Sequence, residues 1–233
     1  MKKRLKINGV IIFAAFLAIV FFPGFFFRHT HEVMLDQAMA AFGITCILLG
    51  QILRVSGRGY KAEHSQNSQA LIEGGPYSLV RNPMYLGILL IGSGIVLALF
   101  KWWAICIFIF FFILRYLLLT FKEEKKLSLL FPQTYPQYCQ RTPRLLPSLK
   151  MLLQADISVY LPLKLSWIKK EIGSILAVLL ITLFIKSYKD IKYQGLTVYF
   201  KGALAMLAVI VLFIYTTAYL IRRTESPRKI CCK

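Results

Sequence analysis

The sequence predicts an all-α integral membrane protein with about six transmembrane helices. Of its 233 residues, 58% are hydrophobic and the mean hydropathy is +0.63, which is more apolar surface than a soluble domain of this length can bury. The apolar residues gather in long runs, and the basic residues behind the net charge of +19 lie between these runs, where lipid headgroups attract them. This distribution explains the charge without nucleic acid, and we expect no nucleic-acid partner.

Six apolar runs define the predicted spans: residues 7–27, 33–53, 83–100, 102–121, 172–185 and 196–221. Four positive charges precede the first run, as in a signal peptide. The run is longer than the apolar part of such a peptide, however, and no small-x-small cleavage site follows it, so we expect an uncleaved span. The chain then divides into two N-terminal helices in residues 1–54, a central part in residues 55–150, and an interfacial segment with two C-terminal helices in residues 151–233.

The basic residues also predict which side of the membrane each loop faces. Of the 29 Lys and Arg residues, 22 lie in the N-terminus, in segments 54–81 and 122–170, and in the C-terminal tail, whereas six lie in the loops of the opposite side. Loops rich in Lys and Arg stay in the cytoplasm. We therefore expect a multi-pass protein of a bacterial inner membrane, with both termini and these two segments on the cytoplasmic side.

Segment 74–85, with the sequence G-G-P-Y-S-L-V-R-N-P-M-Y, leads into the third span and holds the first candidate functional residues. Asn82 is a good N-cap residue and Pro83 suits the first helical position, so a helix is predicted to begin here. Arg81 then lies beside the positive end of the helix dipole, and Tyr85, four residues later, can face the same way. The alternative is a capped membrane helix with an interfacial anchor of Tyr and Arg.

Glu123 and Glu124 follow the fourth span on the same side of the membrane as Arg81. The third and fourth spans have similar lengths and only Lys101-Trp102 between them, so we expect an antiparallel hairpin whose cytoplasmic ends are neighbours. The two carboxylates would then face an arginine and a helix N-terminus, a combination that suits a zwitterionic or cationic ligand. The alternative is that both glutamates only offset the neighbouring lysines at the membrane surface.

The ordered motifs of the central part resemble those of a known family. The pattern G-P-Y-x-x-x-R-N-P-M-Y-L-G at residues 75–87, the glutamate pair, F-x-x-x-Y-x-x-Y at residues 131–138 and P-R-L-L-P at residues 143–147 look like the integral-membrane methyltransferases. These include isoprenylcysteine carboxyl methyltransferases and phospholipid N-methyltransferases, which use S-adenosylmethionine. The resemblance covers roughly residues 43–148 and implies that the hairpin of spans three and four carries the cofactor site.

By position, the resemblance also implies roles for individual residues. Cofactor contacts would come from Gln69, Ala70, Leu71, Ile72, Tyr77, Asn82, Pro83, Met84, Tyr85 and Glu123, with Glu124 in support. Arg81 matches the family arginine next to the cofactor and is the candidate catalytic residue, orienting the nucleophile or the charged end of the substrate. Leu119 stands where the isoprenylcysteine enzymes have a substrate-binding arginine, with Arg115 a further helical turn back, and this departure weighs against a carboxylate acceptor.

The resemblance predicts methyl transfer to an acceptor that is a membrane lipid or a hydrophobic small molecule. Two other classes stay open. NADPH-dependent membrane sterol-type reductases share an R-x-P-x-Y element, but they favour Asn where this chain has Met84 and usually lack the glutamate pair. A non-catalytic membrane scaffold or transporter would keep the fold without the chemistry, although Arg81, Tyr85 and the glutamate pair are all present together.

No metal site is predicted. The five cysteines have neither metal-ligand spacing nor the spacing of a disulfide framework. His29 and His31, with Glu32 beside them, fit a solvated connector between two spans better than a metal site.

Overall fold

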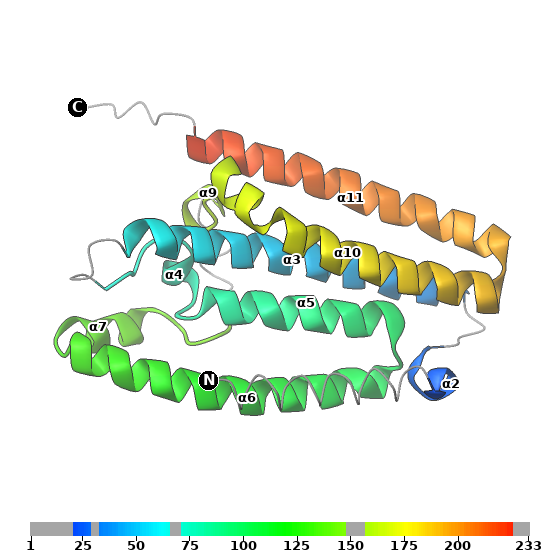
Figure 1. The fold of residues 1–233 in the computed structure, drawn as a ribbon. Coiled ribbons are helices and arrows are strands. Elements are labelled where there is room, and N and C mark those ends of the chain that lie inside the picture. The colour runs from blue at the N-terminus through cyan, green and yellow to red at the C-terminus, as the bar shows by residue number, and fades with distance from the viewer. Residues whose placement is uncertain (1–20, 29–32, 66–70, 148–156, 226–233) are drawn as a thin grey trace.

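The computed structural model describes residues 21–28, 33–65, 71–147 and 157–225, and within these ranges the long regular elements are all helices. They are α2 (Pro23–Phe26), α3 (Val33–His64), α4 (Pro76–Leu79), α5 (Pro83–Leu99), α6 (Trp102–Leu130), α7 (Thr134–Arg141), α9 (Ile157–Tyr160), α10 (Leu165–Gln194) and α11 (Leu196–Glu225). Figure 1 shows the long helices lying alongside one another, with α3 and α5 in the centre, α6 on one side, and α10 and α11 on the other. The prediction of an all-α fold is confirmed for these residues.

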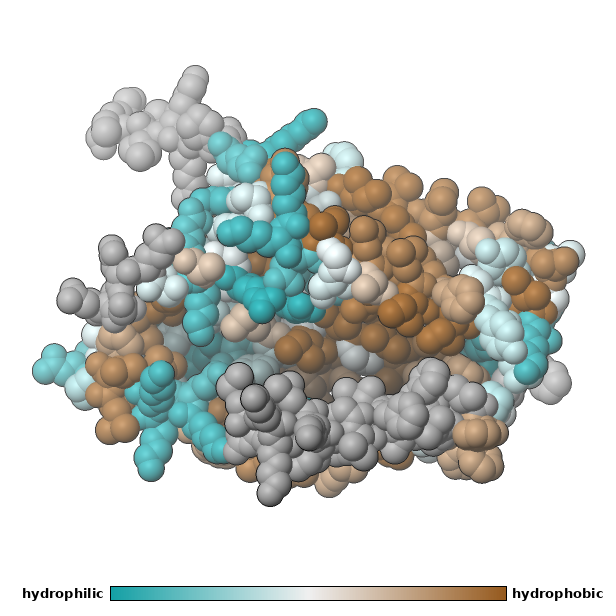
Figure 2. Space-filling model, in the orientation of Figure 1, coloured by the Kyte–Doolittle hydropathy of each residue, from teal (hydrophilic) through white to brown (hydrophobic). Residues whose placement is uncertain are grey.

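Three helices, α3, α6 and α11, are long and apolar enough to cross a membrane. The apolar helix α5 is shorter, with 17 residues. Figure 2 shows hydrophilic side chains gathered at the end of the molecule where α4 and α7 lie, and a broad hydrophobic surface over α10 and α11. Three of the six predicted spans are thus supported by length and composition, and most of the predicted span 7–27 lies outside the described residues.

Three helices continue well beyond the predicted spans, among them α10 (Leu165–Gln194), where the span was predicted at 172–185. The span predicted at 33–53 belongs to α3, which runs to His64, and the span predicted at 102–121 belongs to α6, which runs to Leu130. The apolar pattern marks where the chain leaves the hydrocarbon. The helices continue past that level because the following residues, rich in Lys, Glu and Leu in α6, are good helix formers.

Prolines set several of the remaining boundaries. The predicted first span breaks at Phe22, which is not helical, because Pro23 begins the separate short helix α2 and has no N–H to continue a preceding helix. Pro136 is tolerated in α7 because it lies in the first turn. Pro162 lies between α9 and α10.

The central pair α3 and α5 has the most extensive packing in the described structure, and facing glycines make this possible. A Cβ atom added to Gly43 would lie 2.6 Å from the carbonyl oxygen of Gly94, and one added to Gly50 would lie 2.6 Å from that of Gly87. Only glycine lets two helix backbones approach so closely. The start of α5 is therefore fixed against α3.

Two helical hairpins flank this pair. Phe100 and Lys101 alone link α5 to α6, which run in opposite directions (Figure 1). The turn between α10 and α11 is made by Gly195, whose φ of 86° is readily adopted by glycine only. The second hairpin packs on α3 through buried apolar side chains such as Ile44 and Met206.

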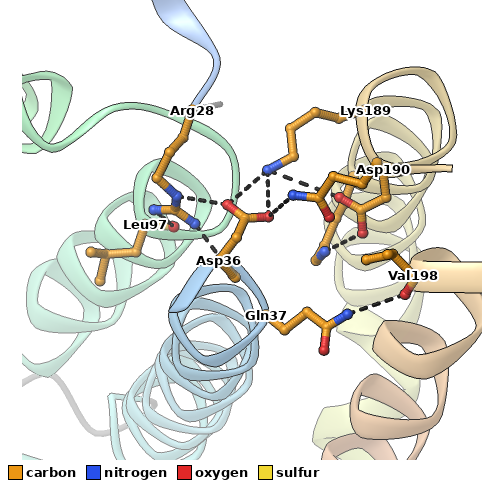
Figure 3. A network of polar contacts seen from close by, with 9 residues as sticks. Arg28, Asp36, Gln37, Leu97, Lys189, Asp190 and Val198 are labelled. Atoms are coloured by element: carbon orange, nitrogen blue, oxygen red, sulfur yellow. Dashed lines mark hydrogen bonds and ion pairs between the residues drawn. The ribbon is translucent and has the colours of Figure 1, made fainter. Parts of the chain in front are cut away.

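A buried ionic network joins α3, α5 and α10 at the end of the molecule opposite α4 and α7 (Figure 3). Asp36 is fully buried and accepts hydrogen bonds from Arg28 Nε at 2.7 Å and from Lys189 Nζ at 2.9 Å. The Arg28 guanidinium also donates to the carbonyl oxygen of Leu97 at 2.9 Å. Asp190, whose carboxylate lies 3.9 Å from Lys189 Nζ, extends the network along α10.

Candidate active site

Segment 74–85 forms a compact turn between α3 and α5. Gly75 has a φ of 56°, and a Cβ atom there would lie 2.8 Å from the ring of Tyr60, so glycine is required on both counts. Pro76 starts the one-turn helix α4, and Pro83 occupies the first position of α5, as predicted. These turns bring side chains of α4 and of the start of α5 onto one wall of a cavity.

The cavity has a volume of about 160 Å³ and lies between α3, α4, α5, α6 and α7. Three charged side chains, four aromatic side chains and several aliphatic ones form its wall. The lining residues are Lys61, Leu71, Ile72, Tyr77, Arg81, Asn82, Pro83, Met84, Tyr85, Glu123, Leu127, Phe131 and Tyr138.

Most residues that the sequence indicates as site residues lie at this cavity. Glu124 lies next to it, in contact with Arg81, and Gln69 and Ala70 fall outside the described residues. The structure therefore brings together two stretches that are distant in sequence, 71–85 and 123–124. Nine of the predicted residues line the cavity: Leu71, Ile72, Tyr77, Arg81, Asn82, Pro83, Met84, Tyr85 and Glu123.

The two adjacent glutamates have different surroundings. Glu124 is held by two arginines, because Arg81 Nη1 donates to it at 3.1 Å and Arg144 donates through Nε at 3.1 Å and Nη2 at 2.8 Å. Glu123 lines the cavity and accepts a hydrogen bond of 3.1 Å from the Tyr85 hydroxyl. Among the described residues no Lys or Arg forms an ion pair with Glu123, so its charge is available to a ligand.

Arg81 ties the start of α5 to the chain that follows α7. Its Nε donates to the carbonyl oxygen of Thr142 at 3.0 Å, and its Nη1 donates to Cys139 Sγ at 3.0 Å as well as to Glu124. Its backbone N–H donates to the carbonyl oxygen of Pro143 at 2.9 Å. Arg81 is thus both a cavity residue and an anchor.

Buried phenols stiffen the other side of the cavity. The Tyr138 hydroxyl donates to the carbonyl oxygen of Tyr77 at 2.7 Å and so joins α7 to α4. Burial raises the pKa of Tyr77 and of Tyr138 above the ordinary value, and the charge of Glu123 raises the pKa of Tyr77 further. Burial likewise raises the pKa of Tyr135 to about 12. These phenols therefore stay neutral at physiological pH and can donate hydrogen bonds.

Asn82 differs from the sequence prediction. It occupies the N-cap position of α5, but its side chain makes no capping hydrogen bond. Its Nδ2 donates instead to the Tyr116 hydroxyl at 3.4 Å, and that hydroxyl donates to the carbonyl oxygen of Arg144 at 3.1 Å. The helix therefore begins where the sequence predicts, with Asn82 at its N-cap position, but the Asn82 side chain does not cap it and bonds to α6 instead. Asn82 connects α5 to α6.

Sequence reasoning missed part of the site. Phe131 and Tyr138 lie in the F-x-x-x-Y-x-x-Y motif and Arg144 in the P-R-L-L-P motif, so the signal existed, but the fold of this segment back onto α6 cannot be read from the motifs. Lys61 and Leu127 line the cavity without any sequence signal that separates them from neighbouring residues.

The cavity offers opposite charges at separate positions. Glu123 supplies a carboxylate, Lys61 and Arg81 supply cations, and the N-terminus of α5 adds a partial positive charge. The ring of Tyr85 can lie against a cationic centre. This arrangement suits a zwitterion with an additional positive charge. Among the described residues, no cluster of three His, Cys, Asp or Glu side chains could hold a metal ion.

Comparison with known proteins identifies the central part of the chain. Residues 38–134 match the family model described as Phospholipid methyltransferase, and this confirms the resemblance for that part. The match includes α4, α5 and α6, whereas Tyr138 and Arg144 follow it. No curated protein and no solved structure matches the chain.

Proposed function

We propose that this chain, a membrane methyltransferase with a core of the phospholipid methyltransferase family, takes its methyl group from S-adenosylmethionine and transfers it to a lipidic or hydrophobic acceptor. An acceptor like that of the isoprenylcysteine carboxyl methyltransferases belongs to this class. The cofactor has an ammonium, a carboxylate and a sulfonium, so the residues that hold it must offer both signs of charge.

The observation that carries the proposal is the carboxylate of Glu123, which faces the cavity without a basic partner among the described residues. It suits the ammonium of the cofactor. The N-terminus of α5 and Lys61 suit the carboxylate, and the ring of Tyr85 suits the sulfonium. The charges present therefore fit the proposed group.

We assign the remaining residues by their contacts. Glu124 holds Arg81, and we assign to Arg81, which lines the cavity, the orientation of the nucleophile or of the charged end of the acceptor. Because Arg81 also anchors the chain after α7, its catalytic role depends on the same contacts that fix its position. The other proposed cofactor contacts are Gln69, Ala70, Leu71, Ile72, Tyr77, Asn82, Pro83 and Met84.

When bound, S-adenosylmethionine supplies a methyl group that is activated by the positive sulfur. Glu123, Lys61, Tyr85 and the N-terminus of α5 would hold the cofactor while this methyl group is transferred to the acceptor nucleophile. Such a transfer needs in-line approach and exclusion of water more than proton transfer, so the contribution of the chain is alignment. Arg81, Tyr85 and Glu123 lie where they can provide it.

Binding experiments on the full chain, purified in detergent, test the cofactor. Titration calorimetry should detect binding of S-adenosylhomocysteine and not of NADPH. Glu123→Gln should weaken that binding about tenfold or more, because a charge-assisted hydrogen bond is lost. Glu63→Gln is the matched control, since Glu63 pairs with Lys164 and does not line the cavity. Binding of NADPH alone would favour the reductase alternative, and binding of neither would favour the scaffold or transporter.

Labelled-methyl transfer identifies the acceptor class. The full chain is incubated with methyl-labelled cofactor and a membrane lipid extract, and the labelled product is then separated and identified. We expect the label in an organic-soluble amphiphile. Label recovered only in water-soluble products would contradict a lipidic acceptor.

The proposed orientation places both termini and the cavity in the cytoplasm, where the cofactor is made. The excess of basic residues in segments 54–81 and 122–170 supports this side. A fluorescent reporter that folds only in the cytoplasm should be active when fused to the C-terminus. If alkaline phosphatase fused to the C-terminus is active instead, the C-terminus lies outside the cytoplasm and the proposed orientation is wrong.

A further inference from the structure

A second cavity, which we call the α3–α10 cleft, lies between the last turns of α3 and the first turns of α10. Its volume of about 440 Å³ exceeds that of the candidate active site, and the two cavities share no lining residue. The two helices meet closely beside it, since a Cβ atom added to Gly59 of α3 would lie 2.2 Å from the indole ring of Trp167 on α10. The cleft is thus a separate site, formed in part by a helix that follows the family match.

Both carboxylates that line the cleft are already paired. Glu171 lies between two arginines: Arg54 Nη2 donates to its Oε2 at 3.0 Å, and Arg58 forms an ion pair with its Oε1. Glu63 accepts a hydrogen bond of 2.6 Å from Lys164 Nζ. Neither glutamate therefore needs a cationic ligand to compensate its charge.

Lys170 is an additional cation of the cleft. It lines the cleft and is exposed, and the ion pairs of the described residues use other Lys and Arg side chains. Arg58, on the facing helix, has 60% of its side chain exposed, so it can also contact a ligand. Four cations therefore surround two carboxylates at the cleft, and this excess of positive charge favours an anionic ligand.

An apolar cavity of about 190 Å³ adjoins the cleft at Val55, which lines both. It lies between α3, α10 and α11 and is lined mainly by Ile, Leu, Val and Phe side chains. On α3 this cavity takes residues 51–55 and the cleft takes residues 55–63, which follow the apolar run 33–53. The charged cleft therefore lies where α3 leaves the hydrocarbon, and the apolar cavity lies on the hydrocarbon side of it.

We propose that the α3–α10 cleft and the adjoining apolar cavity bind one anionic phospholipid. Its phosphate contacts Arg58 and Lys170, and one acyl chain lies between α3, α10 and α11. Basic pockets between membrane helices bind anionic lipid headgroups in this way. The site gives the C-terminal hairpin a role of its own, because the lipid joins α10 and α11 to α3, and it does not depend on methyl transfer.

The simpler explanation is that the charges of the cleft only tie α10 to α3 through ion pairs. This explains the contacts of Glu63 and Glu171, but it gives no role to Lys170 or to the unfilled volume beside it. Such a purely structural cleft would not distinguish anionic from zwitterionic lipids, whereas a headgroup site does.

The test titrates lipids onto the lipid-depleted full chain in non-ionic detergent and measures binding by native mass spectrometry. Phosphatidylglycerol should bind about fivefold more tightly than phosphatidylcholine with the same acyl chains. Lys170→Gln should weaken phosphatidylglycerol binding about fivefold and leave phosphatidylcholine binding unchanged, because one cation at the membrane surface is lost. Arg58→Gln should have a similar effect, since Arg54 still pairs with Glu171.

The controls decide what kind of site this is. Lys126→Gln removes an exposed cation from α6 and should bind phosphatidylglycerol as the wild type does. An equal loss in Lys126→Gln, or equal affinity of the wild type for both lipids, overturns the headgroup site. Glycerol 3-phosphate supplies the anion without acyl chains, and if it binds as tightly as phosphatidylglycerol, the ligand is a soluble anion and the lipid proposal is wrong. Circular dichroism of each lipid-free variant should match the wild type, since Lys170 is exposed.

Discussion

The two ends of the helical bundle each hold a carboxylate between two cations, but the two carboxylates differ in how far they are buried. At the end with α2, Asp36 is fully buried between Arg28 and Lys189, and both its oxygens accept from Lys189 (Figure 3). At the other end, Glu124 lies between Arg81 and Arg144 with its side chain 16% exposed, and the neighbouring Glu123 lines the cavity without an ion-pair partner among the described residues.

The difference separates a structural network from a functional one. Around Asp36, removing one partner leaves a buried charge uncompensated, so the expected loss is in stability. Around Glu124, the groups are partly solvated and hold residues that face the cavity, so the expected loss is in activity. Substitutions around Asp36 should therefore lower the free energy of unfolding, whereas substitutions around Glu124 should lower turnover.

The largest effect is expected for Asp36→Ala. It leaves the charges of Arg28 and Lys189 buried without their acceptor, and we expect a loss of about 3–5 kcal/mol in the free energy of unfolding. Unfolding in detergent, followed by circular dichroism, measures it. Glu63→Ala, which removes an exposed pair with Lys164, should cost less than about 1 kcal/mol. Equal losses of unfolding free energy in Asp36→Ala and Glu63→Ala would contradict the structural role of the Asp36 network.

Arg144→Ala should lower turnover about tenfold to a hundredfold with a small effect on unfolding. Glu124 then loses two charge-assisted hydrogen bonds and no longer fixes Arg81. Initial rates of labelled-methyl transfer measure the effect. Arg58→Ala is the control, because Arg58 forms an exposed ion pair with Glu171. Unchanged turnover in Arg144→Ala would show that the ion pairs of Glu124 are not needed for activity.

Arg81→Lys should lower turnover about tenfold while S-adenosylhomocysteine affinity changes less than about threefold. Lysine keeps the charge but has no Nε–H to donate to Thr142 and no planar fork for Glu124. Parallel kinetics and calorimetry separate the two quantities. If affinity falls as far as turnover, Arg81 acts by shaping the cofactor site and not by orienting the acceptor.

The smallest effect is expected for Tyr85→Phe. The ring stays against Tyr116, but the hydrogen bond to Glu123 is lost, and cofactor affinity should fall about threefold. Calorimetry with S-adenosylhomocysteine measures the change. Tyr193→Phe, on the distant helix α10, is a matched control that should bind as the wild type does. An increase in affinity for Tyr85→Phe would show that the phenol competes with the ligand for Glu123.

The sequence predicted which helices form better than where they end. Apolar runs located α3, α5, α6, α10 and α11, but hydropathy reports the edge of the hydrocarbon, and a helix such as α6 continues past it. The order of the motifs in the sequence predicted most of the cavity residues, because these residues lie in the segments at the start of α5 and the end of α6. Asn82 occupies the predicted N-cap position, but its tertiary hydrogen bond to Tyr116 was not predicted from the sequence.

Long-range partners were not predictable for a physical reason. Asp36 and Lys189 are separated by 153 positions, and their pairing depends on how the hairpin of α10 and α11 docks on α3. Arg144 reaches Glu124 only because the chain turns back after α7. Charge and hydropathy patterns describe single segments, so contacts that arise from docking between segments are invisible to them.

The glycine contacts between α3 and α5 have a consequence for how such a site can change over time. They lock the two helices backbone to backbone, so a larger side chain at the contact would disturb the start of α5 and with it the cavity. The helix α6 is different, since most of its apolar surface is exposed. Substitutions along the exposed side of α6 can therefore be accepted while the α3–α5 contact stays intact, which makes one helix the variable half of the site and the glycine-locked pair its constant half.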